Sequence, residues 1–316
     1  MGGTGKTPVT DQILKALYEQ HQRHVCGLSR GYGRKTRGFR WVQPGDLPSQ
    51  SGDEPLLLKN RAPDRRSFAV CENRVTGIEQ ILKAQPKTQA VVLDDAFQHL
   101  SLRATRYLLL TTWSEPFFDD ATVPVGRLRE GIGARHRAHA IMVTHTPTDT
   151  SATERRAFAE ACRMHPEVPI IFSRMAYTEW RNFQGQTISA PAVSCALLVS
   201  GIARPEFFRN MVAPYFNAEL VSMSFADHHA FSPEDIVRVA RKAAGIGATH
   251  IITTEKDFFR LRHLPNIGLW DAYAPFFPLM EMVVLEDYQA QFNSWLHEFV
   301  DTDRRMRHIH SSERSV

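Results

Sequence analysis

Short apolar runs alternate with amphipathic segments along most of the chain. The runs fall at 25–28, 68–71, 90–93, 107–111 and 140–144, and then at 169–172, 196–200, 218–221, 250–254 and 280–285. Short apolar runs of this kind predict strands that are buried on both faces, and the helical patterns between them predict crossover connections. We therefore expect an α/β fold made of two α/β/α domains with a cleft between them. The first would be a P-loop NTPase-like, mostly parallel sheet.

A polar stretch between the two series of strands suggests where the domains divide. His145–Glu154 is rich in Thr and Pro and predicts a linker. We expect residues 1–147 to form a nucleotide-binding and catalytic domain and residues 148–300 to form a second α/β domain that closes the cleft. The polar and basic residues 301–316 predict a flexible tail.

The chain opens on a glycine-rich segment, Met1-Gly2-Gly3-Thr4-Gly5-Lys6-Thr7-Pro8, that precedes a helical pattern. Backbone N–H groups of such a loop cradle a polyphosphate, and the following helix directs its positive N-terminus toward it. Lys6 would reach the β- and γ-phosphates, and the Thr7 hydroxyl would ligate Mg²⁺. Pro8 suits a first helical turn. A plain glycine turn is the alternative, but Gly-Lys-Thr before a helix favours phosphate binding.

An acidic pair follows the third predicted strand. Val91-Val92-Leu93-Asp94-Asp95 has the form of a Walker B strand, whose carboxylate can hold Mg²⁺ beside the phosphates. Ligands bind beyond the carboxyl ends of strands in open α/β sheets, but acidic residues after an apolar run are common and decide nothing alone. Together with the phosphate-binding loop, the pair favours the magnesium interpretation over a plain acidic strand end.

Four other polar clusters follow predicted strands or turns. Gly52-Asp53-Glu54-Pro55 is either an ordinary turn or a loop that carries a general base for an attacking hydroxyl. Gln98 and His99 could orient substrate or lie at the surface. Arg127 and Arg129 could neutralise a transferring phosphoryl group or form salt bridges. In Asp227-His228-His229, a His–carboxylate pair that tunes a base is favoured over a metal site, because the adjacent histidines have no evident third ligand.

Composition narrows the class of protein. The 316 residues suffice for two domains, and 43% hydrophobic with 23% charged residues is typical of a soluble globular protein. The net charge of +4 is too small to indicate nucleic-acid binding. No signal peptide or apolar run of membrane-spanning length is present, so we expect a cytoplasmic protein, with attachment to a membrane surface left open. The cysteines are widely spaced and predict core residues in a reducing compartment: Cys26, Cys71, Cys162 and Cys195.

One segment is locally basic. It carries Arg30, Arg34, Lys35, Arg37 and Arg40 and is either a solvated loop or a patch for phosphate or anionic lipid.

Taken in order, the motifs resemble those of the tetraacyldisaccharide 4′-kinase family, the lipid A 4′-kinases of Gram-negative bacteria. Each motif is weak alone, but the series covers nearly the whole chain and is specific. The matching segments are Gly2–Pro8, Leu28–Gly33, Gly52–Pro55, Asp94–His99, Gly126–Glu130, Gly201–Ala203, Asp227–His229 and Thr254–Asp257.

The resemblance implies ATP-dependent phosphorylation of the 4′-hydroxyl of a tetraacylated glucosamine disaccharide 1-phosphate, which gives lipid IVA for lipopolysaccharide. It implies ATP and Mg²⁺ as cofactors and a peripheral position on the cytoplasmic face of the inner membrane. The partners would be the lipid substrate and the membrane surface, with no nucleic acid and no protein partner. The basic segment at 30–40 would then lie near the anionic disaccharide or the membrane.

The resemblance also implies roles for single residues. Asp53 would be the base, assisted by His228. Lys6 and Thr7 take the phosphate-loop roles, and Asp94 and Asp95 the roles at Mg²⁺ and the phosphates. Arg74 matches a family arginine near the phosphates. The substrate or cleft residues would be Gln98, His99, Arg127, Arg129 and Glu130.

The chain departs from the family pattern at three places. Ala96 stands where the family commonly has Gly, and His145 where Lys often follows Val-Thr. The family's N-terminal segment, with a membrane-associating helix and the first strand, has no counterpart ahead of Met1. This leaves open a truncated, inactive relic of the kinase. A deviant Walker ATPase of the partition type fits less well. Such proteins have a characteristic lysine just before the two glycines, and in this chain Met1 occupies that position.

Overall fold

The computed structural model describes residues 4–62 and 66–312, and the chain divides into two compact units. Unit 1 comprises Met1–Arg30, Cys71–Met175 and Met282–Val316, and unit 2 comprises Gly31–Val70 and Ala176–Glu281. The units are interleaved along the chain, whereas the sequence predicts the consecutive domains 1–147 and 148–300. The segment that carries Asp53 therefore belongs to the same unit as most of the second half of the chain.

The strands of unit 1 pair in parallel in two groups. β1 (Val25–Ser29) pairs with β4 (Ala90–Leu93), in register from Val25 opposite Ala90 to Leu28 opposite Leu93. β5 (Leu108–Thr112) pairs with β6 (Ala140–Thr144), and β6 pairs with the start of β7 (Ile170–Asn182).

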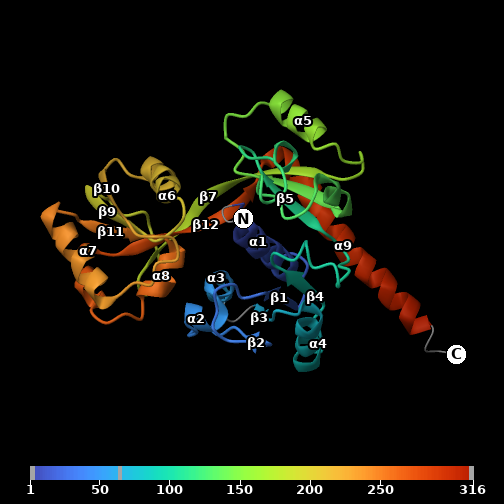
Figure 1. Ribbon diagram of the computed structural model, residues 1–316, viewed down its shortest axis with the longest axis horizontal. Helices are drawn as coiled ribbons and strands as arrows, with labels where there is room; N and C mark the ends of the chain where they lie inside the picture. Colours follow the sequence, from blue (N-terminus) through green and yellow to red (C-terminus); the bar gives the residue numbers. More distant parts are fainter. Residues whose placement is uncertain (1–3, 63–65, 313–316) are drawn as a thin grey trace. The chain divides into compact units, whose positions relative to one another are not determined.

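The helices of unit 1 are labelled in Figure 1. They are α1 (Lys6–Glu19), α4 (Arg74–Ala84), α5 (Ala152–Ala161) and α9 (Glu286–Ser312), with 3-10 turns at Phe117–Asp119 and Ile132–Arg137. The side chain of Ser151 accepts the Glu154 N–H and caps α5, so this helix begins inside the predicted linker. The backbone of α9 is helical to Ser312, where the sequence predicts a flexible tail from 301.

Unit 2 contains a parallel sheet in the order β10-β9-β11-β12, comprising β10 (Glu219–Ser224), β9 (Cys195–Ser200), β11 (His250–Thr253) and β12 (Phe276–Val284). β9 is buried along its whole length, which is the expected burial for a strand covered on both faces. The later part of β7 pairs antiparallel with β8 (Thr187–Ile188). β2 (Arg40–Trp41) pairs antiparallel with β3 (Ser67–Val70).

The helices of unit 2 are α2 (Pro48–Ser51), α3 (Asp53–Arg61), α6 (Pro205–Val212), α7 (Pro233–Gly245) and α8 (Glu255–Leu261), with 3-10 turns at Ala213–Tyr215 and Ile267–Tyr273.

Alternation along β9 explains how the sheet of unit 2 is covered. Leu197 and Val199 pack in one cluster with Ile236 and Val239 of α7, because successive side chains of a strand point to opposite faces. Leu198 packs in the other cluster, with residues of α6 such as Phe208. Unit 1 has its own apolar cluster, which includes Ile141, Val143, Phe158 and Phe172.

The predicted apolar runs coincide with strands, and β7 and β12 extend furthest beyond their predicted bounds. β7 has 13 residues, because it continues past its apolar run through a mixture of polar and apolar residues. β12 has 9 residues, because it begins four residues earlier than predicted, in the buried apolar segment Phe276–Leu279. In the described part of the chain, no helix is both long and apolar enough to span a membrane.

Candidate functional site

The start of α1 has the geometry of a phosphate-binding loop. Gly5 is the N-cap of α1 with φ of 80°, a left-handed conformation that favours glycine. The carbonyl of Thr4 accepts a hydrogen bond from the Thr144 hydroxyl at 3.0 Å, which ties the loop to the end of β6. Lys6, Thr7 and Pro8 form the first turn of α1. Gly2 and Gly3 lie outside the described residues.

The acidic pair after β4 lies close to α1. The Thr10 hydroxyl donates to Asp94 Oδ1 at 3.2 Å, and the carboxylate of Asp94 is buried. Asp95 lies 3.6 Å from the ammonium of Lys6 and 3.4 Å from the guanidinium of Arg129. The structure thus brings together the lysine of the loop, the acidic pair and one of the two predicted arginines.

Arg74 begins α4 and is 4% exposed. Its Nη1 donates to the carbonyls of Cys71 and Glu72, at 2.9 and 3.2 Å, but its buried Nε has no hydrogen-bond partner among the described residues. Burial lowers the pKa of Arg74, against the opposing charge of Asp94. A buried donor without a partner is costly, so this guanidinium is suited to an anionic ligand.

The remaining predicted residues of unit 1 have hydrogen-bond or ion-pair partners within that unit. Glu130 accepts hydrogen bonds from Arg137 at 2.6 Å and from Gln98 at 3.1 Å, and the Arg137 bond lowers the pKa of Glu130. His99 pairs with the Ser101 hydroxyl at 3.1 Å.

Arg127 forms ion pairs with Glu115 at 2.5 Å and Asp120 at 2.9 Å. These contacts match the second of the two interpretations of Arg127 from the sequence, in which it forms salt bridges.

In unit 2, the Gly-Asp-Glu-Pro motif opens a helix rather than a plain turn. Gly52 has φ of 90°, and a Cβ there would lie 2.9 Å from the Tyr32 carbonyl, so glycine is needed where α2 ends and α3 begins. Asp46 accepts hydrogen bonds from Arg40 and from the Ser51 hydroxyl, which holds the segment just before Asp53. Asp53 and Glu54 occupy the first turn of α3, where carboxylates are favoured by the helix dipole.

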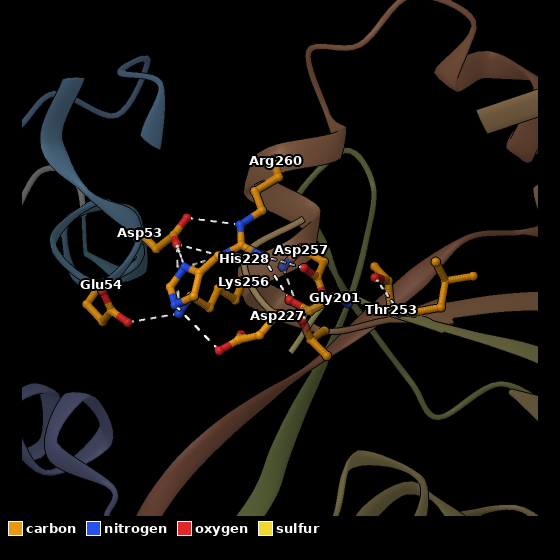
Figure 2. A network of polar contacts seen from close by, with 11 residues as sticks. Asp53, Glu54, Gly201, Asp227, His228, Thr253, Lys256, Asp257 and Arg260 are labelled. Atoms are coloured by element: carbon orange, nitrogen blue, oxygen red, sulfur yellow. Dashed lines mark hydrogen bonds and ion pairs between the residues drawn. The ribbon is translucent and has the colours of Figure 1, made fainter. Parts of the chain in front are cut away.

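The structure brings Asp53 and His228 into contact, although they lie 175 residues apart (Figure 2). His228 Nδ1 lies 2.9 Å from Asp53 Oδ2, and His228 Nε2 lies 3.9 Å from Asp227. His228 has φ of 56°, and its backbone N–H donates to the Gly201 carbonyl at 3.2 Å. The side chain of His228 is 45% exposed and that of Asp53 is 11% exposed, so the imidazole is the more accessible partner.

Three cationic or titratable side chains surround Asp53. Burial alone would raise the pKa of Asp53, but the hydrogen bonds and charge of Arg260, with the charges of Lys256 and His228, outweigh burial and lower it. Asp53 is therefore an ionised carboxylate at neutral pH.

Two residues of this network, Arg260 and Asp257, are not among the residues given roles from the sequence. Asp257 is fully buried on α8, where it accepts hydrogen bonds from the Gly201 N–H at 2.9 Å and the Thr254 hydroxyl at 2.7 Å. Gly201, Thr254 and Asp257 lie in two of the segments that resemble the family. Those segments are the part of the sequence that could have pointed to this cluster. Arg260 follows the last of these motifs and had no signal of its own.

Among the residues that the structure describes, no cluster of three or more His, Cys, Asp or Glu side chains is arranged to hold a metal ion. His229 instead pairs with Asp235 at 2.8 Å, beside the N-terminus of α7.

The fold and the loop geometry define the class: an α/β protein with a P-loop NTPase-like phosphate-binding loop. A crystal structure of LpxK from Aquifex aeolicus in complex with ATP has the same fold, with a TM-score of 0.69 and 22% identity over 94% of this chain and 85% of that one.

The chain belongs to the tetraacyldisaccharide-1-phosphate 4′-kinase family, whose sequence model matches residues 1–300. Tetraacyldisaccharide 4′-kinase of Phocaeicola vulgatus is 33% identical over 96% of this chain and 85% of the relative. The corresponding protein of Bacteroides thetaiotaomicron is also 33% identical, over 96% of this chain and 83% of the relative. The family expected from the sequence motifs is confirmed.

Proposed function

We propose that this chain is an ATP-dependent kinase that transfers the γ-phosphate of ATP to the 4′-hydroxyl of tetraacyldisaccharide 1-phosphate. Family membership over residues 1–300 supports the reaction type. The observation that carries the residue assignment is the 2.9 Å contact between Asp53 and His228, since it joins two distant motifs into one acid–base pair.

In the proposed reaction, unit 1 binds ATP. The loop Gly2–Pro8 and the N-terminus of α1 hold the phosphates, and Lys6 neutralises their charge. Arg74 and Arg129 add positive charge beside the acidic pair. Phosphoryl transfer depends chiefly on such positioning and charge neutralisation.

The oxygen donors of unit 1 fit a magnesium ion. Thr7 supplies a hydroxyl, and Asp94 and Asp95 supply carboxylates, which are the donor atoms that Mg²⁺ prefers. A kinase Mg²⁺ is typically held by one or two carboxylates and the substrate phosphates, so a three-carboxylate cluster is not required. When bound, the ion would neutralise charge on the phosphates.

Unit 2 supplies the proton acceptor. The Asp53–His228 pair removes the proton of the 4′-hydroxyl as its oxygen attacks the γ-phosphorus, and ADP leaves with the electrons of the broken P–O bond. Gln98, His99 and Glu130 are proposed to contact substrate or ordered water.

We further propose that the protein works peripherally on the cytoplasmic face of the inner membrane, where its lipid substrate resides. In the basic segment, Arg34 and Arg40 are held by internal contacts, with the Gly38 carbonyl and with Asp46, whereas Lys35 and Arg37 are exposed. Cations on this surface would attract an anionic disaccharide or anionic lipid.

The membrane proposal predicts that a Lys35→Glu/Arg37→Glu protein binds anionic liposomes less tightly and has a raised KM for the lipid substrate. Each charge near an anionic surface is worth about 1 kcal/mol, so removing two should weaken liposome binding at least tenfold. Unchanged liposome sedimentation together with an unchanged KM would contradict the role of this segment.

The kinase proposal is tested by incubating the protein with [γ-³²P]ATP, Mg²⁺ and tetraacyldisaccharide 1-phosphate in detergent micelles, with product separated by thin-layer chromatography. We expect a labelled bisphosphorylated lipid, and no label with Lys6→Ala. Lys83→Ala, at an exposed lysine in the last turn of α4, is the matched control and should leave the transfer unchanged. Absence of product from the unaltered protein would contradict the proposal.

A further inference from the structure

Arg137 joins two loops of unit 1, the one with the Asp94–His99 motif and the one with the Gly126–Glu130 motif. One nitrogen of its guanidinium, Nη2, donates to Glu130 Oε1 at 2.6 Å and to the Phe97 carbonyl at 3.1 Å. The guanidinium carbon also lies 4.6 Å from the centroid of the Phe97 ring, which is within the range of a cation–π interaction. A single side chain therefore binds both loops.

Gln98 adds a second link between the same two loops. Its Nε2 donates to Glu130 Oε1 at 3.1 Å, the same oxygen that accepts from Arg137. The hydrogen bond between Arg137 and Glu130 lowers the pKa of the carboxyl and raises the pKa of the guanidinium, so both groups are charged at neutral pH. Phe97 packs edge-on against Tyr107 at 5.8 Å, which supports the ring under the guanidinium.

We propose that Arg137 is a positioning residue that holds the loop of Arg129 against the loop of Asp95, and so places the Arg129 guanidinium beside the phosphates of ATP. The inference rests on the proposed kinase function. It gives a role to an arginine that was not among the site residues predicted from the sequence.

The ion pair between Arg129 and Asp95 is too exposed to hold the two loops together by itself. The two side chains are 50% and 38% exposed, and their atoms approach to 3.4 Å. Exposed pairs of this kind contribute little, because water screens the charges and two long side chains must be ordered. The pair of Arg137 with Glu130 is shorter and less exposed, at 33% and 26%. The Arg137 contacts are therefore the stronger connection between the loops.

The residues that the guanidinium binds lie next to the phosphate site in the sequence. Glu130 directly follows Arg129, and Phe97 lies two residues after Asp95, which is 3.6 Å from the Lys6 ammonium. Consecutive Cα atoms are only about 3.8 Å apart, so fixing Glu130 and Phe97 leaves their neighbours little freedom to separate. Loss of these contacts would let Arg129 move away from the lysine of the phosphate-binding loop.

The loop around the Gly126–Glu130 motif keeps its own shape by internal contacts. The Leu128 N–H donates to the Ala121 carbonyl at 2.9 Å. A Cβ at Gly126 would lie 2.2 Å from the same carbonyl, so only glycine fits this close approach. These contacts do not involve the Asp94–His99 loop. The loop can therefore move as a rigid piece, and a contact that ties it to its neighbour decides where it lies.

The first test is hydrogen–deuterium exchange followed by mass spectrometry, which does not depend on kinase activity. It follows one protected amide in each loop: the His99 N–H, which donates to the Ala96 carbonyl at 2.9 Å, and the Leu128 N–H. We expect both amides to exchange at least about tenfold faster in Arg137→Gln, because loss of a charge-assisted hydrogen bond raises local opening. Unchanged exchange at either amide would overturn the inference.

Arg135→Gln is the matched control. Arg135 lies in the same 3-10 turn, and its Nη1 donates to the Ile132 carbonyl of that turn at 3.1 Å. Both amides should exchange in this variant as they do in the unaltered protein. Equal acceleration in Arg135→Gln and Arg137→Gln would mean that any lost charge in the turn has this effect, and would overturn the positioning role.

The second test is a double-mutant cycle on kcat for phosphate transfer from ATP to tetraacyldisaccharide 1-phosphate. We expect Arg129→Gln to lower kcat about 100-fold, as for other donors aimed at developing charge, and Arg137→Gln about tenfold. The double variant should be no slower than Arg129→Gln alone, because Arg137 acts through Arg129. A double variant clearly slower than that, up to the product of about 1000-fold, would show independent action and overturn the inference.

A conservative variant separates the geometry of the guanidinium from its charge. Arg137→Lys keeps a charge beside Glu130 but loses the planar fork, so it should recover only part of kcat. Arg135→Gln should retain the kcat of the unaltered protein. If the unaltered protein transfers no phosphate, the proposed function fails, and the exchange test still decides whether Arg137 holds the two loops together.

Discussion

The buried carboxylates of unit 2 show how single residues set the site. Asp46 accepts hydrogen bonds from Arg40 and the Ser51 hydroxyl, and Asp53 accepts them from Arg260. In each case the hydrogen bonds and nearby positive charge outweigh burial and lower the pKa. Both carboxylates are therefore ionised in the folded protein down to a lower pH than in the unfolded chain. Asp46 binds no ligand in this account, but it holds Ser51, which precedes Gly52 and Asp53.

The lowered pKa of Asp46 predicts how the free energy of unfolding depends on pH. A carboxyl with a lowered folded pKa contributes stability that is present above its ordinary pKa of about 3.8 and is lost as pH falls through the folded pKa. We expect Asp46→Asn to lower the free energy of unfolding by roughly 2 kcal/mol at pH 6, and by less at pH 3.

The measurement is urea unfolding followed by circular dichroism at both pH values. Asp271→Asn, which removes an exposed aspartate of the same unit, serves as control and should change little. A loss of stability in Asp46→Asn that grows toward acid would have the wrong sign for this account.

At the scale of elements, α3 and α8 are joined by a series of polar contacts within unit 2. Asp53 pairs with Arg260, Glu54 with Lys256 at 2.9 Å, and Arg61 with Glu255 at 2.5 Å. α3 starts at the Gly-Asp-Glu-Pro motif and α8 at the Thr-Glu-Lys-Asp motif. The contacts between the two helices therefore bring both motifs to bear on the orientation of the Asp53 carboxylate.

The Arg61–Glu255 pair should matter most for stability, because the two side chains are only 5% and 7% exposed. Glu255→Gln removes the carboxylate charge that faces this buried guanidinium and should cost about 3 kcal/mol in the free energy of unfolding.

Asp287→Asn is the matched control, since Asp287 is 72% exposed in its ion pair with Arg155 and should cost less than about 1 kcal/mol. Equal effects of the two substitutions on the urea midpoint would contradict the buried-pair argument.

The elements differ in how well the sequence predicted them. β1, β4 and β6 were predicted within a residue, because each coincides with a short apolar run. β1 and β6 are buried along their whole length, as expected for strands covered on both faces. The start of α3 was missed, because Gly, Asp and Pro are turn residues that also begin helices.

The candidate site was predictable where a motif carries its own chemistry. The loop at Gly5 and the pair Asp53–His228 follow from motifs. Arg260 could not be predicted, because its role arises from contact with a residue 207 positions away that no local pattern encodes.

At the scale of the whole molecule, the interleaving of the two units is the main departure from a linear division of the chain. Unit 2 needs Gly31–Val70 as well as Ala176–Glu281. The predicted linker at 145–154 lies inside unit 1, so a division there would separate Arg260 and Glu255 from Asp53 and Arg61.

This organisation predicts that residues 148–300 expressed alone do not unfold cooperatively, because buried charged groups of α8 would lose their partners. The fragment should give a shallow urea transition by circular dichroism, beside a steep one for the full chain. A fragment with a steep, two-state transition would show that 31–70 is dispensable for the folding of unit 2.

In the proposed reaction, the Asp53–His228 pair takes the proton of the lipid hydroxyl as the phosphate is transferred. The most direct measurement is the single-turnover rate of phosphate transfer from ATP to tetraacyldisaccharide 1-phosphate by the unaltered protein and by Asp53→Asn, with ATP affinity measured alongside. We expect transfer by the unaltered protein and a loss of roughly 10²- to 10⁴-fold in Asp53→Asn at unchanged ATP affinity. Equal rates for the two proteins, or ATP binding without any transfer by the unaltered one, would contradict it.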